Sequence, residues 1–190
     1  MKAMQKDFEL SIMNLEILYE LSDSIEEKIN IKSSIGRVYL QLGDVTVATE
    51  CFEVAKELRK NKMQSETGKK YTGMKIDELI DDALVSMSTN NFADALNILE
   101  EADRLAPGNS LVINNKSVCL LYLGRLKDAL TNLESELTRN PRNILNESHV
   151  LNLATLYELE SSYAGQKKQA LLDIMSQYAG DGANTACLKF

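Results

Sequence analysis

Apolar residues recur at steps of three and four along most of the chain, which is the spacing of amphipathic α-helices. The first such series contains Met4, Phe8, Ile12, Leu15, Leu18 and Tyr19. It predicts an N-terminal helix with one face that needs a partner, and we expect this helix to cap the rest of the structure. The chain has only 2 prolines and 9 glycines, which favours long helices over the frequent turns of a β-sandwich. The predicted fold class is therefore all-α.

The centre of the chain contains an internal repeat with a period of 34 residues. Segment 92–95, FADA, falls on segment 126–129, LKDA, and Pro107 falls on Pro141. This period, with a small residue, a large apolar residue four positions later and a closing proline, is the signature of the tetratricopeptide (TPR) repeat, a pair of antiparallel helices. We therefore expect a right-handed TPR superhelix of antiparallel helical hairpins, an α-α solenoid.

A better-formed copy of the repeat precedes this centre. Small residues such as Gly36 and Ala48 let two helix backbones approach closely, while Tyr39 and Phe52 fill the volume between them. Gly43 ends the first helix of the pair and lets the chain reverse. The residues expected to set the geometry of the repeats are Gly36, Tyr39, Gly43, Ala48, Phe52, Ala55, Ala95, Pro107, Gly124, Ala129 and Pro141.

We predict a single TPR domain over residues 1–190, made of seven parts. These are an N-terminal packing helix at 1–22, repeat 1 at 29–62, a connector or helix extension at 63–75, repeat 2 at 76–109, repeat 3 at 110–143, an irregular C-terminal hairpin at 144–178 and a tail at 179–190. Three positions depart from the repeat pattern. Asp82 and Ser86 replace a large apolar residue and a tyrosine in repeat 2, and Glu136 replaces alanine in repeat 3. In the last hairpin we take Ala170 as the small packing residue, and we expect the tail to be partly ordered at best.

Charge and cysteine content limit the classes of partner. The net charge of -7 disfavours binding to nucleic acid or to an anionic membrane surface. The best basic cluster, at residues 56–70, is interleaved with glutamates and lacks stacking aromatics. The longest apolar run, Val118 to Leu123, is too short to enter a membrane directly. Cys51, Cys119 and Cys187 are widely spaced, which indicates neither a disulfide framework nor a zinc site.

Motifs for catalysis are missing from the sequence. His149 is the only histidine, and no GxSxG, Walker A or GxGxxG motif occurs. The acidic residues at 77–82 alternate with apolar ones, so we interpret them as a solvated helix face rather than a metal cluster. We predict a protein without catalytic residues, metal, cofactor or small-molecule substrate.

A solenoid offers one generic binding site, the concave groove lined by the first helix of each repeat. The repeat register assigns the following residues to a partner-binding groove: Arg37, Ile80, Leu84, Met87, Asn114, Val118, Leu121, Tyr122 and Asn152. The middle of this groove is apolar, which fits either a contact surface or residues packed between neighbouring helices; both interpretations stay open. Co-chaperone TPR domains place a set of lysine, arginine and asparagine side chains here, and this sequence keeps one cation, Arg37. A receptor for chaperone tails is therefore not expected.

Several stretches agree with one family beyond the general repeat pattern. They are VCLLYLGRLKDAL at 118–130, LYELESS at 156–162, KKQALL at 167–172 and CLK at 187–189, with VYLQLGDV and NNFADA in support. From about residue 30 to its end the sequence resembles the C-terminal TPR region of the twelfth-subunit family of TRAPP, the transport protein particle that tethers vesicles.

The resemblance implies a non-catalytic scaffold whose partners are other TRAPP subunits. It implies a role in traffic from the endoplasmic reticulum to the Golgi and in autophagy. The expected location is cytoplasmic, peripheral to the ER-Golgi intermediate compartment and the Golgi. The alternative is a free-standing TPR adaptor that binds an amphipathic peptide in its apolar concave groove.

Overall fold

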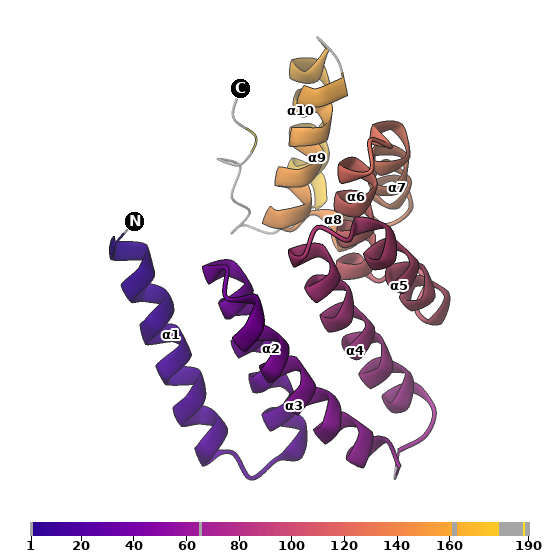
Figure 1. Ribbon diagram of the computed structural model, residues 1–190. Helices are drawn as coiled ribbons and strands as arrows, with labels where there is room; N and C mark the ends of the chain where they lie inside the picture. The colour runs from indigo at the N-terminus through magenta and orange to yellow at the C-terminus, as the bar shows by residue number, and fades with distance from the viewer. Residues whose placement is uncertain (1, 65, 161–162, 179–187, 189–190) are drawn as a thin grey trace. The chain divides into compact units, whose positions relative to one another are not determined.

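The computed structural model describes residues 2–64, 66–160, 163–178 and 188, with side chains from residue 7 onward. All regular structure within these ranges is helical (Figure 1). The α-helices are α1 (Lys2–Leu21), α2 (Ile25–Leu42), α3 (Val45–Met63), α4 (Lys69–Ser88), α5 (Phe92–Leu105), α6 (Ser110–Tyr122), α7 (Leu126–Arg139), α8 (Pro141–Ile144), α9 (Glu147–Glu160) and α10 (Ala164–Tyr178). The prediction of an all-α protein built from helical hairpins is confirmed.

The chain forms two compact units, Met1–Ile98 and Leu99–Phe190. In the first unit α1 packs on α2, α2 packs on α3, and α3 packs on α4 (Figure 1). In the second unit α6 packs on α7, α7 packs on α9, and α9 packs on α10. The segment 63–75, expected as a connector or helix extension, contains the end of α3 and the first turns of α4.

The α2–α3 hairpin shows how the repeat residues act. Gly43 adopts a left-handed conformation with φ of 83°, and its N–H donates to Leu40 O, so α2 ends and the chain reverses there. The Asp44 side chain accepts from Val47 N and caps the start of α3. Gly36 packs so closely against α3 that an added Cβ would lie 2.7 Å from the Phe52 ring. The two backbones therefore approach to a distance that a larger residue at position 36 would prevent.

The α6–α7 hairpin repeats this arrangement with different polar contacts. Ser117 on α6 donates to Ala129 O on α7 at 3.2 Å, and Ala129 is fully buried. Gly124 adopts φ of 75° at the reversal between the two helices. Glu136, at a position where the repeat favours alanine, is buried and accepts from Arg139 Nε at 2.7 Å and from Asn143 Nδ2 at 3.1 Å. A charged residue is accommodated there because local donors satisfy its carboxylate.

The other repeat positions are found in three settings. Ala48, Ala55 and Ala95 are fully buried, and Phe52 is buried as well. Tyr39 is half-buried, Pro107 is exposed between α5 and α6, and Pro141 is the first residue of α8.

Three assignments within the helices were wrong. Ala170 is exposed, and α10 instead buries Leu171 and Met175. Leu18 was placed on the packing face of α1 but is 53% exposed. Asp81 was placed on a solvated face but is 1% exposed. Of the tail 179–190, only Leu188 belongs to the described residues, and it is buried. The side chain of Met4 lies outside the described residues.

Candidate interaction surfaces

A buried cluster of charged and polar side chains ties three helices of the first unit together. Asp81 on α4 accepts hydrogen bonds from Arg59 Nη2 on α3 at 2.7 Å, from Ser33 Oγ on α2 at 2.7 Å and from Arg37 Nη2 on α2 at 2.9 Å. Arg59 Nη2 also donates to Ser33 Oγ at 2.6 Å. Arg59 and Asp81 are each 1% exposed. We call Ser33, Arg37, Arg59 and Asp81 the ion cluster.

The ion cluster determines what the predicted groove residue Arg37 can do. Its guanidinium is committed to Asp81, although 39% of the side chain remains exposed. Further along α4, Ile80 is buried, whereas Leu84 and Met87 are half-buried. Leu84 and Met87 therefore keep some accessible surface, Arg37 is partly exposed but already paired, and Ile80 belongs to the core.

Two groove residues predicted in the second unit contact each other. Asn152 Nδ2 on α9 donates to Asn114 Oδ1 on α6 at 2.9 Å, and both side chains are half-buried. His149, one turn before Asn152, is 1% exposed and places Nε2 2.7 Å from Ser110 O. Burial lowers the pKa of His149 from its ordinary value of 6.5, partly opposed by the hydrogen bond to Ser110. The imidazole thus links α9 to the start of α6, which is a structural role.

The end of α6 presents the remaining predicted groove residues. Val118 and Leu121 are half-buried, and Tyr122 is 66% exposed. An apolar surface with a tyrosine beside it is typical of protein contact sites. The groove that would join these residues to those on α2 and α4 stays a prediction.

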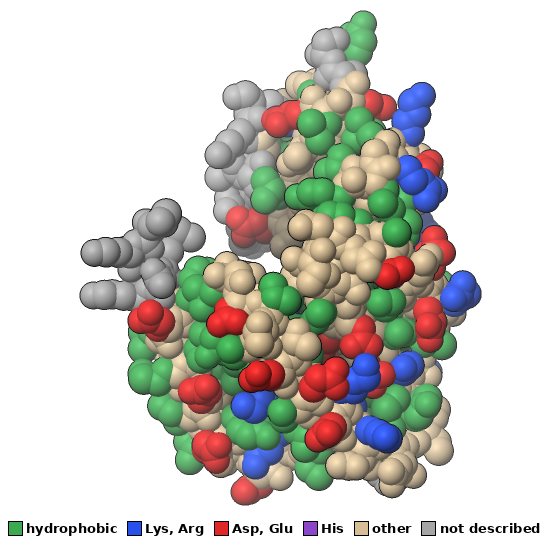
Figure 2. Space-filling model, viewed as in Figure 1, with side chains coloured by type: hydrophobic (Ala, Val, Ile, Leu, Met, Phe, Trp, Pro, Cys, Tyr) green, Lys and Arg blue, Asp and Glu red, His purple; other side chains and the backbone are tan. Residues whose placement is uncertain are grey.

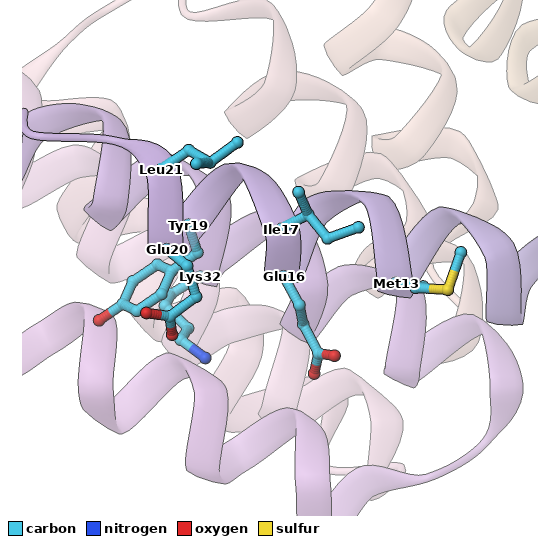
Figure 3. Close-up of a pocket in the computed structure, with 7 residues that line it drawn as sticks. All are labelled: Met13, Glu16, Ile17, Tyr19, Glu20, Leu21 and Lys32. Carbon is cyan, nitrogen blue, oxygen red and sulfur yellow. The ribbon is translucent and has the colours of Figure 1, made fainter.

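The N-terminal helix has a second apolar face that the sequence analysis missed. While Ile12 is buried against α2, a different series on α1 is half exposed or more, and it contains Leu10, Met13, Ile17, Leu18 and Leu21. A hollow of about 460 Å³ is lined by Met13, Glu16, Ile17, Tyr19, Glu20, Leu21 and Lys32 (Figure 3). The spacing of residues 10, 13, 17 and 21 was the signal that could have found it, because it is a second helical series in the same helix.

Within residues 7–64, 66–160 and 163–178, the side chains form no group of three or more His, Cys, Asp or Glu residues that could hold a metal ion. Cys51 and Cys119 are free, buried thiols, and burial raises the pKa of both, to about 11 for Cys119. No helix in these ranges is both long enough and apolar enough to cross a membrane.

The paired helices and their small, buried crossing residues define a TPR-type helical repeat protein. No protein-family model matches the chain. Over 164 residues, 86% of the chain, it is 42% identical to Trafficking protein particle complex subunit 12 of Homo sapiens, and equally to the Mus musculus protein of the same name. The predicted resemblance to the twelfth TRAPP subunit is confirmed. The chain spans 21% of the human protein and 20% of the mouse protein.

Among solved structures, one match is described as the TPR2AB-domain:pHSP90-complex of yeast Sti1. It shares 16% sequence identity at a TM-score of 0.42, covering 92% of this chain and 71% of that chain.

Proposed function

We propose that this chain is a non-catalytic TPR scaffold that assembles with other subunits of the TRAPP tethering complex. The observation that carries the proposal is the 42% identity to the twelfth subunit over 164 residues. The structure supports a role as a protein-binding scaffold, because stacked helical hairpins present extended surfaces for protein contacts. The corresponding cellular role is traffic from the endoplasmic reticulum to the Golgi and autophagy. The corresponding location is cytoplasmic and peripheral to the ER-Golgi intermediate compartment and the Golgi.

Co-purification tests this proposal directly. The chain, carrying an affinity tag, is expressed in cultured cells, and bound proteins are identified by quantitative mass spectrometry. Subunits of TRAPP are expected to be enriched over a tag-only control. Recovery of chaperones without TRAPP subunits would contradict the proposal.

In the second unit, the surface formed by Val118, Leu121 and Tyr122 on α6 is the candidate contact site for other TRAPP subunits. Leu121→Asp places a carboxylate beside Val118 and Tyr122, and in a desolvated interface an unpaired charge abolishes a modest complex. Leu105→Asp is the matched control, since Leu105 is an exposed leucine on α5. A folded Leu121→Asp variant that still recovers every TRAPP subunit would eliminate this surface as the contact. Loss of the circular dichroism signal would instead identify Leu121 as internal core.

A free-standing peptide-binding adaptor is the second candidate function. It is favoured by the same exposed Tyr122 and half-buried Leu121, which could hold the apolar side of a short amphipathic peptide. Isothermal titration with such peptides separates the two candidates. Saturable binding that Leu121→Asp abolishes would support the adaptor, whereas the scaffold role expects weak or no binding at α6.

A further inference from the structure

Helix α1 is apolar on two opposite sides. An α-helix turns by about 100° per residue, so the series at residues 8, 12, 15 and 19 and the series at residues 10, 13, 17 and 21 lie about half a turn apart. The first series faces α2, where Ile12 is buried. In the second series Leu21 is 74% exposed, and Leu10, Met13 and Ile17 are each about half exposed. The side of α1 that points away from α2 is therefore largely apolar.

The outer face of α1 is hollowed on both sides of Leu21. The hollow in Figure 3 runs along Met13 and Ile17 to Leu21. A second hollow of about 420 Å³ is lined by Leu18, Leu21, Ser22, Glu27, Asn30 and Ile31. Five large apolar side chains of α1 are half exposed or more, and contiguous apolar patches on a soluble monomer are often functional. The exposed apolar residues of α1, with a hollow on each side of Leu21, form a surface on which another helix could pack.

The charges around this face are acidic. Lys2 and Lys6 lie in the first turns of α1, but the part from Asp7 to Leu21, which includes the α1 residues that border both hollows, carries four acidic residues and no lysine or arginine. Glu9, Glu16 and Glu20 lie along one flank of the exposed stripe, by the same helical geometry. The side of the space-filling view over α1 shows acidic side chains between apolar ones (Figure 2). Lys32, the basic residue of the first hollow, is drawn onto the Tyr19 ring, with Nζ 4.4 Å from the ring centroid.

We propose that the outer face of α1 binds an amphipathic helix of a partner protein whose apolar side is flanked by lysine or arginine. The apolar stripe accepts the apolar side, and Glu9, Glu16 and Glu20 face the basic flank. The inference rests on the proposed scaffold role, since it assigns one of the scaffold's contact surfaces.

Peptide binding to the intact chain tests the inference. Two fluorescent helical peptides of about 18 residues share one leucine stripe and differ only in lysine or glutamate flanks. By fluorescence anisotropy the lysine peptide is expected to bind and the glutamate peptide is not. Ile17→Asp should raise the Kd of the lysine peptide at least about tenfold, whereas Leu159→Asp, at an exposed leucine elsewhere, should leave it unchanged.

A second pair of variants isolates the charge component. Glu16→Gln with Glu20→Gln should weaken binding and reduce its dependence on salt. Glu100→Gln with Glu101→Gln removes two exposed carboxylates from α5 and is the matched control, expected to have little effect. Circular dichroism verifies that every variant is folded.

Five outcomes would overturn the inference. Three concern the peptides: neither peptide binds, both bind equally, or Ile17→Asp has no effect on binding. The other two are self-association that Ile17→Asp abolishes, and crosslinks from a photoreactive residue at position 17 to the chain's own segment 179–190. The proposed function is judged separately. If the wild-type chain and Ile17→Asp recover TRAPP subunits equally and no peptide binds, the inference fails and the scaffold role stands. If the wild-type chain recovers no TRAPP subunit, the scaffold role fails.

Discussion

Removing the negative charge from the ion cluster should destabilise the first unit strongly. Asp81→Asn keeps the size of the side chain but leaves the buried Arg59 guanidinium without its charged partner. Arg59 cannot reach water, because it is 1% exposed. Its Nε and Nη1 also find no hydrogen-bond partner among the described residues, so the Asp81 carboxylate is its main source of compensation.

Asp82, the next residue in α4, makes a more exposed ion pair with which the loss of the Asp81 charge can be compared. Asp82 makes an ion pair with Lys56 at 3.1 Å, and the two side chains are 36% and 39% exposed. Exposed pairs of this kind contribute about 1 kcal/mol or less, whereas removing one partner from a buried pair costs about 3–5 kcal/mol. Asp81→Asn should therefore lower the free energy of unfolding by several times the effect of Asp82→Asn.

Urea unfolding followed by far-ultraviolet circular dichroism measures the difference between the two variants. Hydrogen exchange should place the loss of protection in α2, α3 and α4. The double variant Arg59→Met with Asp81→Leu should recover most of the stability, because buried ion pairs replaced by apolar residues of similar volume are often neutral or stabilising. The reasoning is refuted if Asp81→Asn lies within about 1 kcal/mol of Asp82→Asn.

Three further predictions follow from glycine packing, a buried histidine and a buried thiol. In thermal melts Gly36→Ala should destabilise the protein, because its Cβ would meet a ring at 2.7 Å, whereas Gly73→Ala in α4 meets nothing within 4 Å and should stabilise by about 0.5–1 kcal/mol. The pKa of His149 is lowered by burial, so the unfolded state takes up a proton first as the pH falls. The free energy of unfolding should be maintained above pH 6.5 and decrease below it, and urea titrations of His149→Gln should lack this dependence. With the other two cysteines replaced by serine, Cys119 should react with a thiol reagent at about pH 8 only as fast as the protein unfolds, because burial raises its pKa to about 11. Rapid labelling of the folded protein would contradict this.

The helical hairpins could be predicted from the sequence because they depend on local spacing. Gly43 ends α2 through its left-handed backbone, and Ala48 and Ala129 are fully buried at helix crossings. A turn glycine and small residues at helix crossings are needed in every repeat, so the 34-residue period is enough to predict their positions.

The ion cluster could not be predicted in the same way. Asp81 belongs to a run that reads as a solvated face, and its burial depends on Arg59, 22 residues earlier, and on Ser33, 48 residues earlier. A local pattern contains no information about such pairing. The prediction that Leu18 packs inward was wrong for a related reason. Helix α1 carries two apolar series, and only packing on α2 decides which one is buried.

The ion cluster also has a consequence for the order in which the first unit folds. The α2–α3 hairpin joins neighbours in sequence, and such local contacts form early. Asp81 arrives with α4 and must lose its water before Arg59 and Ser33 can replace it, so its contacts are expected to form after the rate-limiting step. Asp81→Asn should then accelerate unfolding while leaving the folding rate nearly unchanged in stopped-flow experiments. We expect α4 to dock on the α2–α3 hairpin late in folding and to detach from that hairpin before α2 and α3 separate from each other.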